Sequence, residues 1–90
     1  MTKIALVTGG TRGIGASVSI SLKKAGYNVA ATYNSNTEKA NAFASEHEIE
    51  VFQWNVADSA ACEAGVKQVQ GKMGSIDILI NNAGISKASM

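Results

Sequence analysis

The chain has 90 residues, of which 46% are apolar and 17% are charged, a composition that is typical of one small globular unit and excludes a disordered tail. Eight basic and seven acidic side chains give a net charge of +1 and form no basic block, which argues against a nucleic-acid or anionic-membrane partner. The single Cys excludes an intramolecular disulfide. The apolar run at residues 4–7 is too short for a signal peptide or a membrane span. We therefore expect a soluble, cytoplasmic protein.

Short apolar runs alternate with segments of helical periodicity in the first half of the chain. Ile4 to Val7 predicts a strand buried on both faces. A helix should follow, ended by Gly26, and its buried face is predicted from residues that recur every three or four positions: Ile14, Val18, Leu22 and Ala25. Residues 28–33 predict the second strand, which the polar segment at 34–36 ends.

The second half of the chain continues this alternation. A helix is expected from Thr37 to about Glu46, with inward-facing side chains at Ala40, Phe43 and Ala44. Residues 50–56 predict the third strand, in which Trp54 should pack in or beside the sheet. Asp58 or Ser59 should cap the third helix, whose inner face is predicted to be Cys62, Val66, Val69 and Met73. Residues 76–80 predict the fourth strand.

Strands that alternate with helices predict a parallel sheet with right-handed crossovers. Two helices then lie on one face, and the third crosses the other face to place strand four beside strand one. The expected fold class is α/β, the N-terminal half of a Rossmann-like doubly wound parallel sheet with β-α-β-α-β-α-β order and strand order 3-2-1-4. Strand four would be an open apolar edge. We therefore interpret residues 1–90 as a truncated, N-terminal part of a larger domain.

The strongest motif is Thr8-Gly9-Gly10-Thr11-Arg12-Gly13-Ile14-Gly15, which directly follows the first predicted strand and opens the first predicted helix. Glycines at this place let the backbone approach a pyrophosphate, whose charge the free N–H groups of the helix N-terminus can bind. A purely steric role for a Gly-rich turn is the alternative. No Gly-Lys-Ser/Thr closes the motif, which excludes a nucleoside-triphosphate P-loop.

The glycine spacing, Gly-x3-Gly-x-Gly, together with Asn81-Asn82-Ala83-Gly84 after the fourth predicted strand, resembles the short-chain dehydrogenase/reductase family over the whole chain. At finer grain, the stretches at 5–10, 25–27, 54–56 and 61–63 are similar to those of NADPH-dependent acetoacetyl-CoA reductases. The 3-oxoacyl-acyl-carrier-protein reductases are close relatives of that group and remain an alternative. The resemblance implies reduction of a 3-oxoacyl thioester, acetoacetyl-CoA to 3-hydroxybutyryl-CoA, by the intact family member.

The resemblance also implies the cofactor-binding residues. Those around the pyrophosphate and adenosine phosphate would be Gly9, Thr11, Arg12, Gly13, Ile14 and Gly15. Those beside the adenine would be Asn55 and Val56, where many relatives have Asp-Val and where the Asn55 side-chain oxygen can still accept from the adenine amino group. Those on the ribose and nicotinamide side would be Asn82, Ala83, Gly84 and Ile85. Asn81 and Asp77 are expected to tie neighbouring strands together.

Charge around the second predicted strand favours NADP as the cofactor. An NAD-specific site places a carboxylate near the end of this strand to bind the ribose 2′-hydroxyl, but no acid occurs between Gly15 and Glu38. Arg12 can bind a 2′-phosphate through two hydrogen bonds, and neutral hydrogen bonds are expected from Tyr33, Asn34 and Ser35. The alternative is that this segment is simply a polar turn.

The family's catalytic pair, Tyr-x3-Lys, is not found in these 90 residues, because Ala31 follows Tyr27 and Thr37 follows Tyr33 at that spacing. We predict no catalytic residue and no hydride transfer by this chain alone. The resemblance implies an acyl-CoA or acyl-carrier-protein thioester substrate and a homotetramer for the intact enzyme. A non-catalytic NADP-binding module and a decayed gene product are the alternatives. No metal site is predicted, because His47 has no second ligand at a suitable spacing.

Overall fold

Four parallel strands form one sheet in the order β3-β2-β1-β4. The computed structural model describes residues 2–82. In chain order, its elements are β1 (Ile4–Val7), α1 (Gly13–Lys24), β2 (Asn28–Tyr33), α2 (Thr37–His47), β3 (Glu50–Gln53), α3 (Ser59–Met73) and β4 (Ile78–Ile80). The predicted fold class, element order and strand order are confirmed.

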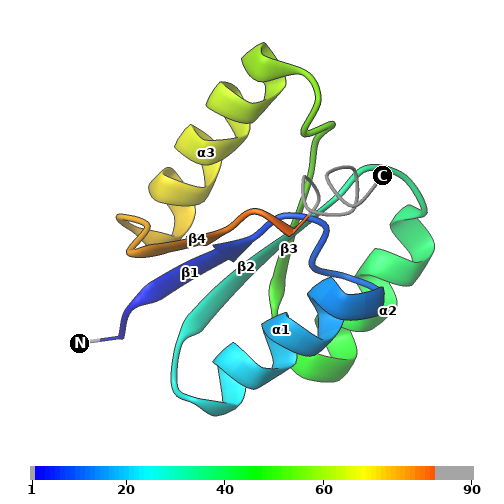
Figure 1. The fold of residues 1–90 in the computed structure, drawn as a ribbon, viewed down its shortest axis with the longest axis vertical. Coiled ribbons are helices and arrows are strands. Elements are labelled where there is room, and N and C mark those ends of the chain that lie inside the picture. Colours follow the sequence, from blue (N-terminus) through cyan, green and yellow to red (C-terminus); the bar gives the residue numbers. More distant parts are fainter. Residues whose placement is uncertain (1, 83–90) are drawn as a thin grey trace.

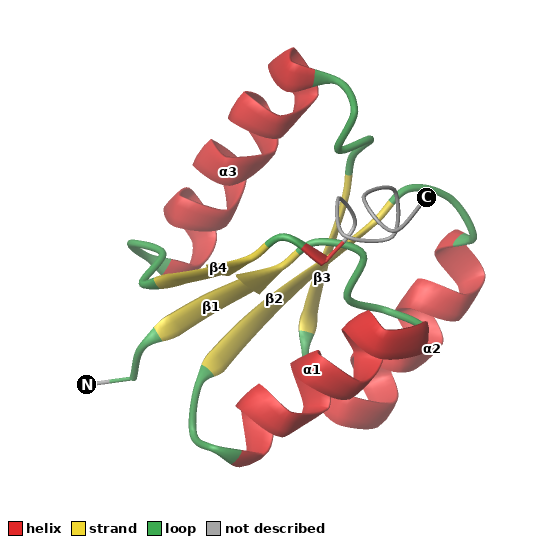
Figure 2. Cartoon of the chain, in the orientation of Figure 1, coloured by secondary structure: helices red, strands yellow, loops and turns green. Residues whose placement is uncertain are grey.

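The helices cover the two faces of the sheet unequally. Figure 1 and Figure 2 show α1 and α2 on one face and α3 alone on the other, as the handedness argument predicts. Each face has its own core. Leu6 of β1 packs in one cluster with Trp54 and with Val69 of α3, whereas the next residue, Val7, packs in the other with Phe43 of α2. This alternation follows from the period of two along a strand.

The strand register brings the ends of β1, β2 and β4 to one edge of the sheet. Val7 lies opposite Ala31 of β2 on one side and opposite Ile80 of β4 on the other. The segments that follow these three strands therefore leave the sheet at the same carboxyl edge, which is where open parallel sheets bind ligands.

The buried face of α1 differs from the one predicted. Ile14, predicted to face inward, is 77% exposed, and Ala25 is exposed as well. The buried positions are instead Gly15 and Ser19, with Val18 and Leu22 half-buried. The reason is the close approach of the helix to the glycine loop, because small residues must face a neighbour that a larger side chain would push away.

Two predicted strands are shorter than expected because their partners set their length. β3 ends at Gln53 rather than Val56, since the last pairing of β2 is Tyr33 opposite Gln53. β4 begins at Ile78 rather than at residue 76, and its first pairing with β1 is Ile78 opposite Ala5. Strand length was therefore decided by pairing and not by the apolar run.

The helix ends and most of the inner faces agree with the predictions. Gly26 follows α1 with a φ of 102°, the conformation that favours glycine. Asp58, one of the two predicted caps of α3, accepts a hydrogen bond from the Ala61 N–H at 3.1 Å. Ala40 and Phe43 of α2 are buried, and Trp54 is 7% exposed beneath α3.

Strand β4 lies at the edge of the sheet, as predicted. Among residues 2–82 it pairs only with β1, and Leu79 in its centre is 60% exposed. The unpaired N–H and C=O groups of such an edge can pair with a strand of another chain.

Candidate functional site

The N-terminus of α1 has no capping side chain. Arg12 occupies the cap position with extended backbone and makes no side-chain cap hydrogen bond, and the first turn contains no acidic residue. The other two helices of residues 2–82 are capped by side chains, α2 by Asn36 and α3 by Asp58. The first N–H groups of α1 thus lack a side-chain acceptor, and with the positive end of the helix dipole they can bind an anion.

Polar side chains from three elements hold the glycine loop in place. The Gly9 N–H donates to Thr32 Oγ1 of β2 at 3.0 Å, and Ser19 Oγ of α1 donates to the Gly10 carbonyl at 3.0 Å. Asn82 Nδ2, beyond β4, donates to the Gly9 carbonyl at 3.2 Å. Because Thr32 and Ser19 are completely or almost completely buried, the loop has its shape before any ligand arrives, which lowers the cost of ordering it on binding.

Two glycines of the loop have different roles. A Cβ on Gly15 would lie 2.7 Å from Asn82 Nδ2 and would also overlap the Gly9 carbonyl, so Gly15 lets α1 pack directly against the loop. Gly13 has a φ of 60°, which favours glycine, and a Cβ there would meet nothing within 4 Å. Gly13 therefore borders open space at the start of the helix, where a ligand can approach the backbone.

Polar contacts tie β4 to β1, as was expected of Asn81 and Asp77. Thr8 Oγ1 donates to Asn81 Oδ1 at 3.2 Å, and the Ile4 N–H donates to Asp77 Oδ2 at 2.8 Å. These bonds join the two ends of the β1–β4 pair, so the structural role predicted for both residues is confirmed.

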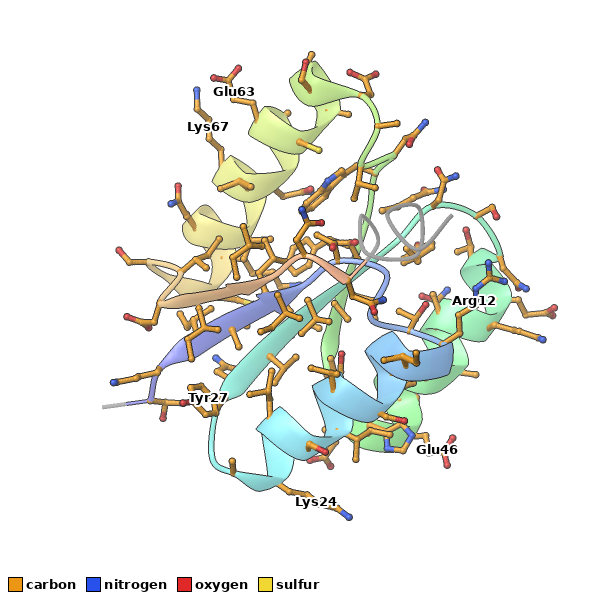
Figure 3. The ribbon with its side chains drawn as sticks, in the orientation of Figure 1. Arg12, Lys24, Tyr27, Glu46, Glu63 and Lys67 are labelled. Carbon is orange, nitrogen blue, oxygen red and sulfur yellow. The ribbon has the colours of Figure 1, made fainter. Side chains whose placement is uncertain are left out.

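A cavity of about 440 Å³ lies between the start of α1 and the segment that joins β2 to α2. Its lining residues are Gly9, Thr11, Arg12, Gly13, Tyr33, Asn34, Ser35, Asn36, Lys39 and Asn82. Two of them are cations and none is an acid. Figure 3 shows the Arg12 side chain extending from the start of α1 toward the N-terminal end of α2. The cavity is therefore electropositive and suited to an anionic ligand.

Eight of the predicted site residues line this cavity: Gly9, Thr11, Arg12, Gly13, Tyr33, Asn34, Ser35 and Asn82. Ile14 and Gly15 do not line it, since Gly15 is buried against the loop and the Ile14 side chain is exposed. Ala83, Gly84 and Ile85 lie outside the described residues. The cofactor contacts assigned to all of these residues stay predictions.

Asn55 and Val56 are also absent from the lining of the cavity. Asn55 Oδ1 accepts a hydrogen bond from the Ala57 N–H at 2.9 Å, so one lone pair of the oxygen expected to face an adenine is already used in a local turn. The Val56 side chain packs against the core under α3. The Val56 backbone carbonyl accepts a hydrogen bond from the Cys62 thiol at 3.2 Å. The adenine contacts of this pair remain a prediction.

Four residues of the site were not predicted from the sequence. Thr32 and Ser19 hold the glycine loop through hydrogen bonds. The only feature of the sequence that could have indicated this role is a polar residue at a buried position, and burial is known only once the strand register is known. Asn36 and Lys39 line the cavity because α2 begins beside α1. The sequence could have indicated Lys39 as a cavity residue, because it lies in the first turn of the helix that follows the second strand.

Within residues 2–82, no three His, Cys, Asp or Glu side chains are grouped so as to hold a metal ion. The same part of the chain contains no helix with the length and apolar character needed to cross a membrane.

The family model for the short chain dehydrogenases matches residues 3–90. This match shows that the chain belongs to the short chain dehydrogenase family. The parallel sheet and the glycine loop before α1 agree with it.

Two kinds of reductase within this family are similar in sequence to the chain. The chain is 54% identical over 90 residues to an acetoacetyl-CoA reductase of Paracoccus denitrificans and spans 37% of the length of that protein. It is 44% identical over 95 aligned residues to a 3-oxoacyl-acyl-carrier-protein reductase of Staphylococcus aureus and spans 39% of it. In both cases the whole of this chain is covered.

Solved structures agree with this assignment. A Serratia marcescens short-chain dehydrogenase/reductase variant superposes with a TM-score of 0.83 at 38% identity, covering 89% of this chain and 35% of that one. A short chain dehydrogenase from Bacillus anthracis superposes with a TM-score of 0.81 at 30% identity, covering 89% and 35%.

Proposed function

We propose that residues 1–90 are the NADP-binding N-terminal part of a short-chain reductase domain. The whole protein then reduces acetoacetyl-CoA to 3-hydroxybutyryl-CoA with NADPH, as a cytoplasmic homotetramer. The observation that carries the cofactor proposal is the uncapped N-terminus of α1, which opens with Arg12 into a cavity that no acidic residue lines. The 54% identity to an acetoacetyl-CoA reductase supports the substrate.

The residues of the cavity fit a dinucleotide phosphate. The free N–H groups at the start of α1 would bind the pyrophosphate, next to the open space at Gly13. Arg12 would bind the 2′-phosphate, because its planar guanidinium matches phosphate geometry and no carboxylate of residues 2–82 forms an ion pair with it. When bound, NADPH would supply the hydride. The residues that line the cavity would bind and orient the NADPH molecule.

The chain contributes binding and not proton transfer. Tyr33 lines the cavity beside Asn34, and the residue four positions after it is Thr37 rather than Lys. A 90-residue polypeptide of this sequence should therefore bind NADP and show no reductase activity by itself.

The second candidate substrate is a 3-oxoacyl group on acyl carrier protein, which the 44% identity to the Staphylococcus reductase favours. The same fold and the same cavity would serve it, because both substrates are 3-oxoacyl thioesters. The two candidates differ only in the carrier of the acyl chain.

Binding of the cofactor is tested by isothermal titration of the 90-residue chain with NADP⁺ and with NAD⁺. We expect tighter binding of NADP⁺, and a roughly tenfold weakening of that binding in Arg12→Ala, the usual size of a lost charged hydrogen bond. Lys24→Ala removes the same charge at the far end of α1 and is the matched control (Figure 3). Equal or tighter binding of NAD⁺ would exclude the proposed cofactor.

The domain assignment and the cofactor preference are tested with a chimera. These 90 residues replace the aligned 90 residues of the Paracoccus acetoacetyl-CoA reductase, to which they are 54% identical. The chimera should reduce acetoacetyl-CoA with NADPH in preference to NADH. A folded chimera that uses NADH equally well would show that the N-terminal part does not select NADP.

A further inference from the structure

The two edges of the sheet differ in the side chains that they present. At the β3 edge, the Glu50 carboxylate pairs with Lys72 Nζ of α3 at 3.0 Å, and Gln53 is exposed. Lys72 Nζ also lies 5.9 Å from the centre of the Phe52 ring. Charged and polar side chains on an edge strand oppose its pairing with another chain. The β3 edge is therefore poorly suited to accept a further strand.

The β4 edge presents no charge of its own. Figure 2 shows β4 at the end of the sheet opposite to β3, and its residues Ile78, Leu79 and Ile80 are all apolar. Ile78 and Ile80 are half-buried, whereas Leu79 is 60% exposed. Covering this strand would remove apolar surface from water, which favours association.

The backbone of β4 also has hydrogen-bonding groups at the outer edge. Successive peptide carbonyls of a strand point to alternate sides, and the Ile80 carbonyl points toward β1, because it accepts a hydrogen bond from the Thr8 N–H at 3.0 Å. The Leu79 N–H and carbonyl therefore point away from β1. An antiparallel strand can exchange a pair of hydrogen bonds with one such residue.

Both faces of the edge are apolar. Leu79 lies opposite Leu6 of β1, whose side chain belongs to the core on the α3 face. Ile80 packs with Val7 in the core on the other face. A strand that pairs with β4 must therefore bring apolar side chains to both faces of the sheet. A second copy of β4 does so.

The residues that flank β4 select one register for such a pair. With Leu79 opposite Leu79 of the second copy, Ile78 lies opposite Ile80, and all three apolar residues are matched. Asp77 then lies opposite Asn81. A shift toward the start of the strand would bring the two Asp77 carboxylates opposite one another, and like charges in that position are destabilising. The register centred on Leu79 avoids this repulsion.

Self-pairing of β4 also closes the assembly. Two copies that use the same edge are related by a twofold axis, so the pair leaves no further β4 edge free. Pairing of β4 with β3 of the next copy would instead continue without limit. The charged groups at the β3 edge, Glu50 and Lys72, disfavour that arrangement. The different edges thus favour a dimer over a fibre.

We propose that the 90-residue chain forms a twofold dimer through antiparallel pairing of β4 with β4 of a second copy, centred on Leu79. The pairing extends the sheet across both copies and covers the exposed Leu79 side chain. This inference goes beyond the proposed function, because no residue of the cofactor cavity takes part in the contact.

The test is sedimentation velocity of the 90-residue chain between about 10 μM and 1 mM, because a contact this small associates weakly. We expect a reversible equilibrium of monomer and dimer without larger species. Leu79→Lys and Leu79→Glu should each weaken the dimer roughly tenfold, since both remove the apolar pair and place like charges opposite one another.

A mixture of the two variants distinguishes self-pairing at Leu79 from a general effect on solubility. In an equimolar mixture of Leu79→Lys and Leu79→Glu, the mixed dimer places opposite charges across the twofold axis. It should therefore form more readily than the dimer of either variant alone, and added salt should weaken it.

Gln53→Lys is the matched control, because Gln53 is an exposed residue on the opposite edge of the same sheet. It should leave the dissociation constant of the dimer within about twofold of that of the parent chain. The far-UV circular dichroism of all variants should equal that of the parent chain, since each change is at an exposed side chain.

Three results would overturn the proposal. A parent chain that is monomeric at the highest concentration would show that a second copy does not cover β4, and would leave the edge to a strand of a different polypeptide. Open-ended assembly of the parent chain would refute the closed twofold pair. A mixture of the two Leu79 variants that associates no better than each alone would refute the register centred on Leu79.

Discussion

Replacement of Gly65 in α3 by Ala is predicted to destabilise the protein, although Ala is the better helix former. Gly65 faces the Trp54 indole, and a Cβ at this position would lie 2.5 Å from Cζ3 and closer still to two other ring carbons. Carbon atoms in contact prefer separations of about 3.5–4.0 Å. Either α3 must move away from the sheet by roughly 1 Å, or the buried indole must leave its place.

The expected magnitude follows from two opposing terms. Overpacking of a well-packed core costs about 1–3 kcal/mol, and complete loss of a buried aromatic side chain costs about 3–5 kcal/mol. The gain in helix propensity from Gly to Ala is about 1 kcal/mol. Because the overlap is with a rigid ring and not with a flexible chain end, we expect the upper part of the overpacking range. Gly65→Ala should therefore lower the free energy of unfolding by about 2 kcal/mol.

Gly71 provides the control within the same helix. A Cβ on Gly71 would meet nothing within 4 Å, so Gly71→Ala gains the propensity term alone and should stabilise the protein by up to about 1 kcal/mol. The two substitutions are chemically identical and are predicted to have opposite signs. Only the contact with Trp54 distinguishes them.

The assay is urea unfolding at low protein concentration, followed by far-UV circular dichroism and by the fluorescence of Trp54, the single tryptophan. In a Trp54→Leu background, Gly65→Ala should cost less than in the parent chain, because a smaller side chain leaves room for the Cβ. A stabilising effect of Gly65→Ala in the parent chain would refute the packing argument. So would an equal cost in both backgrounds.

Three further substitutions test other features. Glu48 ends α2 with a φ of 56° and donates its N–H to the Ala44 carbonyl, so Glu48→Gly should raise the free energy of unfolding by about 0.5–1 kcal/mol in urea, and a decrease would contradict the reasoning. Asp77→Ala removes the acceptor of the Ile4 N–H and should cost about 1–2 kcal/mol in the same assay. Asp77→Asn, which keeps an oxygen acceptor, should cost less. Leu79→Lys on the open edge of β4 should raise the soluble fraction after centrifugation with an unchanged circular dichroism spectrum, and an unchanged soluble fraction would show that this edge does not drive association.

The topology was predictable because it depends on rules that act along the chain. The apolar run from Ile4 to Val7, the glycines after it and the helical periodicities determine the order of elements, and right-handed crossovers then allow the strand order β3-β2-β1-β4. The glycine loop was predictable for a similar reason. Its function depends on backbone that only glycine permits, at a place where a strand meets a helix.

The faces and ends of the elements were less predictable because neighbours decide them. Ile14 fits the helical spacing of an inward residue, yet Gly15 and Ser19 face the sheet because the helix packs closely on the loop. The third strand stops where β2 stops pairing, although the apolar pattern continues to Val56. The apolar periodicity of a segment shows which of its side chains are apolar. It does not show how closely a neighbouring helix, strand or loop packs against that segment in the folded protein.

The amino-acid sequence by itself therefore determined the family, the sheet order and the place of the glycine loop, since each follows from local backbone preferences and connection rules. Tertiary structure alone decided that Lys39 shares a cavity with Arg12, that Gly65 packs against Trp54 and that Thr32 supports the loop. These three facts depend on distances between elements that are far apart in the chain. Such distances are set by packing of the whole sheet and its helices, which no local pattern encodes.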